Sequence, residues 1–151
     1  MDRVSGCLSC DRNELTDRPV REQILVTEFW RLAHAFGTPI PGWLVLLPLR
    51  HVTSVSELNS GESAELGGLL AASSRAVEVV TRCRKTYLAM FAEKAGFAHV
   101  HFHLVPRAAD LPPELRGPRV FELLGGPADE WVSDDEADRV SGEIRRELGD
   151  G

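Results

Sequence analysis

The sequence is most informative at residues 99–105, which read His99-Val100-His101-Phe102-His103-Leu104-Val105 and alternate histidine with apolar side chains. Successive side chains of a β-strand point to opposite faces of a sheet. The alternation predicts a strand over residues 98–105, with three histidines on one face and apolar side chains in the core. Imidazoles grouped on one face suit metal binding, proton transfer or nucleophilic attack. The alternative is an exposed, histidine-rich strand without a function.

The residues on either side of this stretch predict four more strands and two helices. Short apolar runs between turn residues predict strands over residues 24–27, 29–35, 43–47 and 86–91. Asn59 or Ser60 begins a long helix with an apolar stripe, and a capping box at residues 133–136 begins a final helix that ends near Leu148. Four prolines between residues 106 and 118 exclude regular structure over most of that segment. This order of elements predicts an α+β domain with an antiparallel sheet.

Length and composition narrow the class of protein. A chain of 151 residues with 43% hydrophobic and 26% charged residues suits one globular domain. The net charge of −6 argues against a nucleic-acid partner, because non-specific binding needs Lys and Arg to neutralise phosphates. No apolar run approaches the roughly 20 residues that span a bilayer, and the first residues lack the apolar stretch of a signal peptide. We therefore expect a cytoplasmic protein without a membrane partner.

The pair Cys7-Leu8-Ser9-Cys10 has a spacing that suits two thiolates on one tetrahedral zinc ion. Two further ligands must then come from elsewhere in the chain, and histidines are the natural supply. One alternative is a thioredoxin-like redox pair, although that motif belongs between a strand and a helix of a βαβ unit. The other is two unrelated buried thiols.

The third histidine signal is Pro48-Leu49-Arg50-His51-Val52, which follows the apolar run of residues 43–47. A histidine in a loop at a strand end is placed to reach a site, although a single solvated histidine is equally common.

Together these motifs resemble the histidine-triad (HIT) family of nucleotide hydrolases and transferases. Residues 99–105 match its motif H-φ-H-φ-H-φ-φ, in which φ is apolar, at all seven positions, and Pro106-Arg107 continues it. Residues 41–52 resemble the strand and the following P-x-x-H-[IV] segment of the family, and Cys7 and Cys10 match the cysteine pair of its zinc-containing branch. The resemblance implies a HIT-like domain over residues 1–151, with a sheet of about five strands. The motifs lie in residues 7–107, residues 108–151 form a C-terminal extension, and a homodimer is implied.

The resemblance also implies roles for individual residues. His101 matches the nucleophile that attacks the α-phosphorus of a nucleotide, and His103 matches the residue that contacts the phosphate and protonates the leaving group. The zinc ligands of the family's metal-bearing members correspond to Cys7, Cys10, His51 and His99. Four protein ligands leave no open position on zinc, so the metal would be structural. A histidine at position 103 favours hydrolysis over nucleotidyl transfer.

The expected activity is hydrolysis of a phosphoanhydride, phosphoester or phosphoramide bond through a nucleotidyl-histidine intermediate. The alternatives are a nucleotidyltransferase, a nucleotide-binding or regulatory protein with little turnover, and a purely structural zinc protein. The segment Ala95-Gly96-Phe97-Ala98 lacks the polar Gly-Gln-[Ser/Thr] residues that bind phosphate in many family hydrolases. We expect His34 and Trp43 to line the substrate pocket, unless they only pack in the core. We expect Arg107 to attract the phosphates, unless it is only a solvated surface charge.

Overall fold

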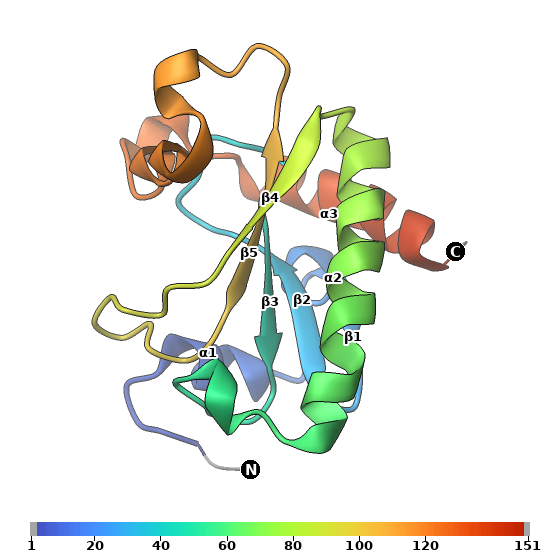
Figure 1. The fold of residues 1–151 in the computed structure, drawn as a ribbon, viewed down its shortest axis with the longest axis vertical. Coiled ribbons are helices and arrows are strands. Elements are labelled where there is room, and N and C mark those ends of the chain that lie inside the picture. Colours follow the sequence, from blue (N-terminus) through green and yellow to red (C-terminus); the bar gives the residue numbers. More distant parts are fainter. Residues whose placement is uncertain (1–2, 150–151) are drawn as a thin grey trace.

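A computed structural model describes residues 3–149 of the chain. Its centre is an antiparallel sheet with the strand order β1-β2-β3-β5-β4, and two long helices cover one face of this sheet (Figure 1). The strands are β1 (Leu25–Val26), β2 (Trp30–His34), β3 (Leu44–Pro48), β4 (Lys85–Ala89) and β5 (Phe102–Arg107). The α-helices are α1 (Leu8–Asn13), α2 (Ser60–Thr81) and α3 (Asp134–Gly149). Short 3-10 helices occupy Val20–Glu22, Val55–Glu57, Pro113–Leu115, Gly117–Leu123 and Ala128–Glu130.

The strands predicted before the long helix are present: β1 and β2 are shorter than expected, and β3 has the expected length but begins and ends one residue later. β1 and β2 form an antiparallel hairpin in which Leu25 faces Leu32, and β2 pairs with β3 from Trp30–Pro48 to His34–Leu44. Every residue of β2 is buried, because the helices cover one face of the strand and later segments cover the other. The predicted α+β domain with a five-stranded antiparallel sheet is confirmed.

Helix α2 begins where its capping residues predict. The Asn59 side chain accepts a hydrogen bond from the Glu62 backbone N–H, and the Glu62 carboxylate accepts one from the Asn59 backbone N–H. This capping box satisfies two amide groups that the first turn leaves without partners. Arg82, with a left-handed φ of 56°, follows the last helical residue. The predicted final helix is α3, whose buried Val140 and Ile144 join the main core. No helix within residues 3–149 is long and apolar enough to cross a membrane.

The last strand differs from its prediction. We expected residues 98–105, but β5 is Phe102–Arg107, so His99 and His101 precede the strand in irregular backbone. Here the Val100 N–H donates to the Val52 carbonyl, 2.8 Å away, rather than to a neighbouring strand. Pro106, just beyond the predicted strand, lies inside the observed one. It is tolerated because pairing with β3 stops at Leu104, so no ladder bond on that side needs an N–H at residue 106.

The second face of the sheet is covered by residues 108–132. Three short 3-10 helices occupy this segment. We expected no regular structure over most of residues 106–118, because of their four prolines. Its buried Leu111 and Val120 pack with Trp43 and Val105 in a second core. Backbone hydrogen bonds from Gly125 N to Gly37 O (2.8 Å) and from Val132 N to Thr38 O (2.9 Å) attach the segment to the β2–β3 loop. The side of the sheet that bears His103 is therefore enclosed by the chain's own later residues.

Candidate functional site

Two histidines of the motif lie side by side. His103 is on β5 and His101 directly precedes that strand, and the centres of their rings are 4.9 Å apart with the ring planes at 73°. His103 is buried and His101 is partly buried. The two imidazoles are thus adjacent, as predicted, although only His103 belongs to the strand.

The hydrogen bond at His101 defines its tautomer. Its Nδ1 lies 2.8 Å from the His99 backbone carbonyl oxygen. A carbonyl oxygen can only accept, so Nδ1 of the neutral ring must carry the proton and donate. The lone pair of the neutral ring is then on Nε2.

His103 is held in the opposite tautomer. The indole Nε1 of Trp43 lies 3.0 Å from His103 Nδ1. An indole N–H can only donate, so Nδ1 must be the unprotonated acceptor and Nε2 of the neutral ring carries the proton. Burial, and to a smaller extent the charge of His101, lowers the pKa of His103 from 6.5 to about 3. In their neutral forms the two rings therefore present a lone pair on His101 and an N–H on His103.

Both histidines line a cavity of about 670 Å³. Its walls come from α1, β2, the segment 91–97 and the segment 121–131. Many of the side chains at this cavity are aromatic: Phe36 and Phe97 have ring centres 6.1 Å apart, and Phe91 packs at 5.2 Å against Phe121. Arg12 lies 4.7 Å from the centre of the Phe36 ring. Flat rings beside a guanidinium group suit a planar aromatic ligand.

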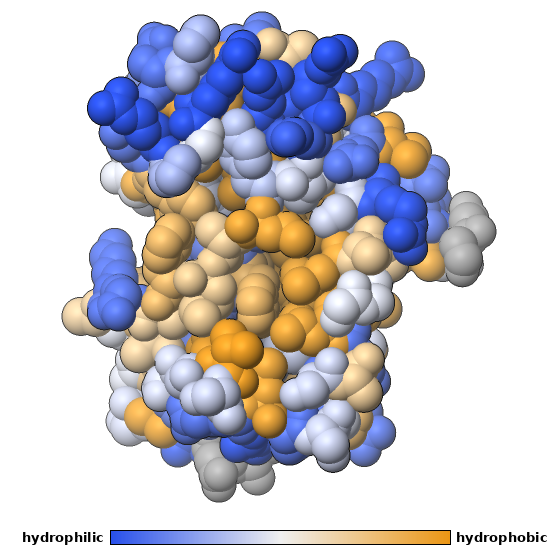
Figure 2. Space-filling model, in the orientation of Figure 1, coloured by the Kyte–Doolittle hydropathy of each residue, from blue (hydrophilic) through white to orange (hydrophobic). Residues whose placement is uncertain are grey.

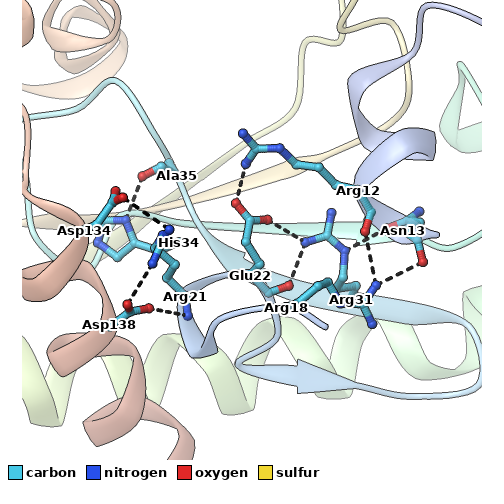
Figure 3. Close-up of polar contacts among 10 residues, drawn as sticks. All are labelled: Arg12, Asn13, Arg18, Arg21, Glu22, Arg31, His34, Ala35, Asp134 and Asp138. Atoms are coloured by element: carbon cyan, nitrogen blue, oxygen red, sulfur yellow. Dashed lines mark hydrogen bonds and ion pairs between the residues drawn. The ribbon is translucent and has the colours of Figure 1, made fainter. Parts of the chain in front are cut away.

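A buried ion network forms one wall of this cavity (Figure 3). Arg31 is 2% exposed, and its guanidinium donates to Glu22 (3.1 Å) and to the Asn13 side chain (2.7 Å). Arg12 pairs with the other carboxylate oxygen of Glu22. Burial lowers the pKa of Arg31, while Glu22 opposes that shift. The network joins α1 to β2 and so fixes the position of α1 at the cavity.

The second cluster joins four metal-ligand side chains from three parts of the chain. The sulfur or nitrogen ligand atoms of Cys7, Cys10, His51 and His99 all lie within 4.8 Å of one another. The Cys10 sulfur is 3.3 Å from His51 Nδ1 and 3.6 Å from His99 Nδ1. A tetrahedral zinc ion with ordinary Zn–S and Zn–N bonds places such atoms about 3.6 Å apart. The four residues thus have the chemistry and the spacing to bind one metal ion.

The surroundings of His99 also fit a metal ligand. Its Nε2 donates to the Pro48 carbonyl oxygen, 2.8 Å away, which leaves the Nδ1 lone pair directed at the cysteines. Metal-bound histidines commonly have such a partner on their other nitrogen. Burial lowers the pKa of His99 to about 4, so the ring is neutral, as a ligand must be.

The three residues expected to bind substrate lie in different places. Trp43 is fully buried against His103 and Phe121 rather than among the cavity-lining residues. His34 is at the cavity, but its Nδ1 donates to the Ala35 carbonyl and its Nε2 accepts from the Gly42 N–H. Arg107 ends β5, opposite Lys85, and is not among the cavity-lining residues. Substrate binding by these three residues stays a prediction.

Several residues at the cavity were not identified from the sequence. Arg12 belongs to a helix of six residues, too short for a periodic pattern, and Phe36, Phe97 and Phe121 are isolated aromatics outside regular strands and α-helices. Their only signal is an aromatic residue in an otherwise polar or glycine-rich segment. That signal does not show which way each side chain points, so it cannot show that these side chains line one cavity.

Comparisons with known proteins identify the fold. Neither a protein-family model nor a curated protein matches the sequence. Solved structures do match. A hypothetical histidine triad nucleotide-binding protein from Sulfolobus tokodaii has a TM-score of 0.72 and 14% identity over 95% of this chain and 93% of that chain. A Zn-bound histidine triad family protein from Mycobacterium smegmatis has a TM-score of 0.66 and 17% identity over 95% and 96%. A Hit-like protein involved in cell-cycle regulation from Bartonella henselae has a TM-score of 0.67 and 15% identity over 90% of each chain. The fold is thus that of the histidine-triad proteins.

Proposed function

We propose that this protein is a histidine-triad hydrolase that cleaves a bond at the α-phosphorus of a nucleotidyl substrate through His101. The proposal rests mainly on one observation. The Nε2 lone pair of His101 and the Nε2–H of His103 belong to adjacent rings on the wall of one cavity. A phosphoryl group needs a nucleophile at phosphorus and a donor at its oxygens, and the pair supplies both.

In the proposed reaction, His101 Nε2 attacks the phosphorus, the bond from phosphorus to the leaving group breaks with its electron pair on that group, and a covalent nucleotidyl-histidine forms. The His99 carbonyl oxygen accepts a hydrogen bond from His101 Nδ1–H, and so stabilises the positive charge that develops on the His101 ring. His103 donates its Nε2–H to a phosphoryl oxygen. Water then attacks the phosphorus, the P–N bond breaks, and a nucleoside monophosphate is released.

The cavity supports a nucleotide as the ligand. Its volume of about 670 Å³ is within the ordinary range of small-molecule sites. The aromatic side chains Phe36 and Phe97 offer ring faces for a base, and Arg12 adds a guanidinium group beside them.

We further propose that the four-residue cluster binds a structural zinc ion. Cys7, Cys10, His51 and His99 would fill all four positions, so the metal would hold α1, the loop after β3 and the segment before β5 together. Zinc bound there supplies rigidity rather than an activated water. The thiolate ligands also need a reducing compartment, which is why we place the protein in the cytoplasm.

A turnover assay tests the proposed function. Purified protein is incubated with dinucleoside polyphosphates, nucleoside phosphoramidates and aryl esters of nucleoside monophosphates, and monophosphate release is measured. We expect release by the wild type and none by His101→Ala. A rapid quench in alkaline detergent, in which the P–N bond to histidine survives, with substrate labelled at the α-phosphorus, is expected to leave label on the wild-type protein only. Full activity of His101→Ala contradicts the proposal.

The second candidate is a nucleotide-binding protein with little turnover. It is favoured by the segment 95–98, which offers no polar side chain to a phosphate and places Phe97 at the cavity. Calorimetry that finds micromolar nucleotide affinity, together with no product from any substrate class above, would support this candidate. A nucleotidyltransferase would instead require a second phosphate as acceptor, which the same assay detects as a new nucleotide conjugate.

We also propose a homodimer that forms along β4 and α2. β4 is an edge strand of the sheet, with Leu88 50% exposed on it and Val79 57% exposed on α2. Figure 2 shows apolar side chains across the middle of the face on which α2 and β4 lie in front. A second copy would pair with this edge and cover these side chains. Light scattering at the monomer mass, or a mass unchanged by Leu88→Lys, would contradict the dimer.

A further inference from the structure

Trp43 lies where it controls the protonation of His103. Its side chain is fully buried, with its ring 5.8 Å from the His103 ring and 5.4 Å from Phe121, edge-on to both. The backbone of Trp43 is fixed as well, because its carbonyl accepts from the Ala35 N–H at 2.8 Å. The indole therefore has no freedom to turn its N–H away from His103.

This contact restricts what His103 can do. An imidazolium carries protons on both nitrogens, so its Nδ1–H would face the Trp43 N–H at 3.0 Å with no acceptor between them. The neutral ring can donate a hydrogen bond from Nε2, but loss of that proton would leave an imidazolate anion in a buried site. The rings packed against His103 are those of Trp43, Phe121 and His101, and of these only His101 is titratable. His103 is thus a hydrogen-bond donor that keeps its proton.

We propose that Trp43 is a positioning residue that holds His103 in this tautomer, and that the enzyme consequently cleaves substrates whose leaving group departs as an anion without receiving a proton. Phosphoanhydrides and acyl phosphates of nucleotides have such leaving groups, namely phosphate and carboxylate. Phosphoramidates and alkyl esters do not, because an amine or an alcohol leaves only when protonated. The inference rests on the proposed function and narrows its substrate class.

The reaction balances without a proton from His103. The His101 Nε2 lone pair forms a bond to phosphorus, and the bond from phosphorus to the leaving oxygen breaks with its electron pair on that oxygen. Water then forms the new P–O bond, the P–N electron pair returns to Nε2, and the proton lost by water enters the solvent. His103 donates the same hydrogen bond throughout.

A series of leaving groups tests the proposal. The probes are phenyl esters of adenosine and guanosine 5′-monophosphate whose ring substituents vary the acidity of the phenol. Without proton donation the rate depends steeply on this acidity, so we expect the wild type to cleave the 4-nitrophenyl ester at least about 10²-fold faster than the unsubstituted phenyl ester. In Trp43→Phe the Nδ1 of His103 is free to bind a proton, and we expect that ratio to fall by about 10²-fold, the low end of a general-acid contribution. A shallow dependence in the wild type, or an unchanged ratio in Trp43→Phe, overturns the proposal.

The matched control is Trp30→Phe. Trp30 is also buried, but its Nε1 donates to the Glu62 backbone carbonyl and its side chain belongs to the main core under the helices. Loss of that N–H is expected to affect stability and leave the ratio of the two esters unchanged. A ratio that falls equally in both variants would assign the effect to general loosening and contradict the role of Trp43.

Nuclear magnetic resonance of the wild-type protein with ¹⁵N-labelled histidine separates this proposal from the proposed function. We expect His103 to show one neutral tautomer with its proton on Nε2, and a proton on Nδ1 at neutral pH overturns the proposal. If no ester is cleaved, the proposed function fails, and the assignment of Trp43 is then decided by this spectrum alone. The spectrum also decides the question if Trp43→Phe does not fold.

Discussion

His101 and His103 have rings 4.9 Å apart and are held in opposite tautomers by groups that can form only one kind of hydrogen bond. The acceptor at His101 is the His99 carbonyl, and the donor at His103 is the Trp43 indole. The pair therefore differs in chemistry although the two residues are identical. A lone pair on one ring and an N–H on the other arise from position rather than from residue type.

Substitution of His103 tests its role as a donor. In His103→Gln the amide oxygen can accept from Trp43 while the amide N–H₂ donates to phosphate, so we expect activity within about 10-fold of the wild type. His103→Ala has neither group, and we expect a loss of about 10²–10³-fold in kcat. Steady-state kinetics on the 4-nitrophenyl ester measures both. If the Gln variant is as inactive as the Ala variant, hydrogen bonding does not explain the function of His103.

Removal of one cysteine of the cluster tests the metal site. We expect Cys10→Ser to lose bound zinc and to unfold several degrees lower than the wild type, because metal binding contributes directly to folding. Elemental analysis is expected to find about one zinc per wild-type chain, and calorimetry gives the melting temperatures. The control is Cys83→Ser, since Cys83 is outside the cluster and partly buried. Equal zinc content in the Cys10 and Cys83 variants would contradict the assigned ligands.

Acid is expected to destabilise the protein through His103. Burial lowers the pKa of this residue from 6.5 to about 3, so between these values the unfolded chain binds a proton that the folded protein does not. The free energy of unfolding therefore falls as the pH is lowered from about 6.5 toward about 3, by an amount on the order of a few kcal/mol. Urea unfolding of the wild type and His103→Gln at pH 7, 5 and 4 measures this contribution. Parallel pH dependences in the two proteins would contradict it.

The ion network at α1 offers a test of packing at the cavity wall. Glu22→Gln leaves the buried Arg31 without its opposite charge, and we expect a loss of about 3–5 kcal/mol in the free energy of unfolding. Glu143→Gln removes one of the two carboxylate partners of Arg139, whose side chain is 60% exposed, and is expected to cost less than about 1 kcal/mol. Denaturant titrations measure both. Similar losses would show that burial does not determine the strength of the network.

The sequence predicted the strands and helices whose positions are determined by their own residues rather than by distant contacts. The apolar run of residues 43–47 became β3, and Asn59 with Glu62 formed the predicted cap of α2. The bounds of β5 were wrong, because alternation describes which way side chains point but not where the backbone finds a partner. Val100 bonds to Val52, a loop residue, and no local pattern could show this.

The site was predicted in its chemistry more than in its geometry. The proximity of His101 to His103 followed from the alternation, whereas the ligand set of the cluster followed only from the resemblance to a family. Trp43 was expected to line the substrate pocket. An aromatic residue near a site can line the pocket or pack in the core, and its position in the sequence does not distinguish these roles. Its contact with His103 depends on the pairing of β3 with β5, in which Val45 faces His103.

The cavity has walls from distant parts of the chain, while the two histidines come from one short segment at the start of β5. Changes in residues 121–131 or in α1 can therefore alter which molecules fit without moving the ring nitrogens of His101 and His103. Such an arrangement separates the walls of the cavity from the histidine pair along the sequence. Evolution, or an engineer, can then replace one wall to redirect the same chemistry to a new compound.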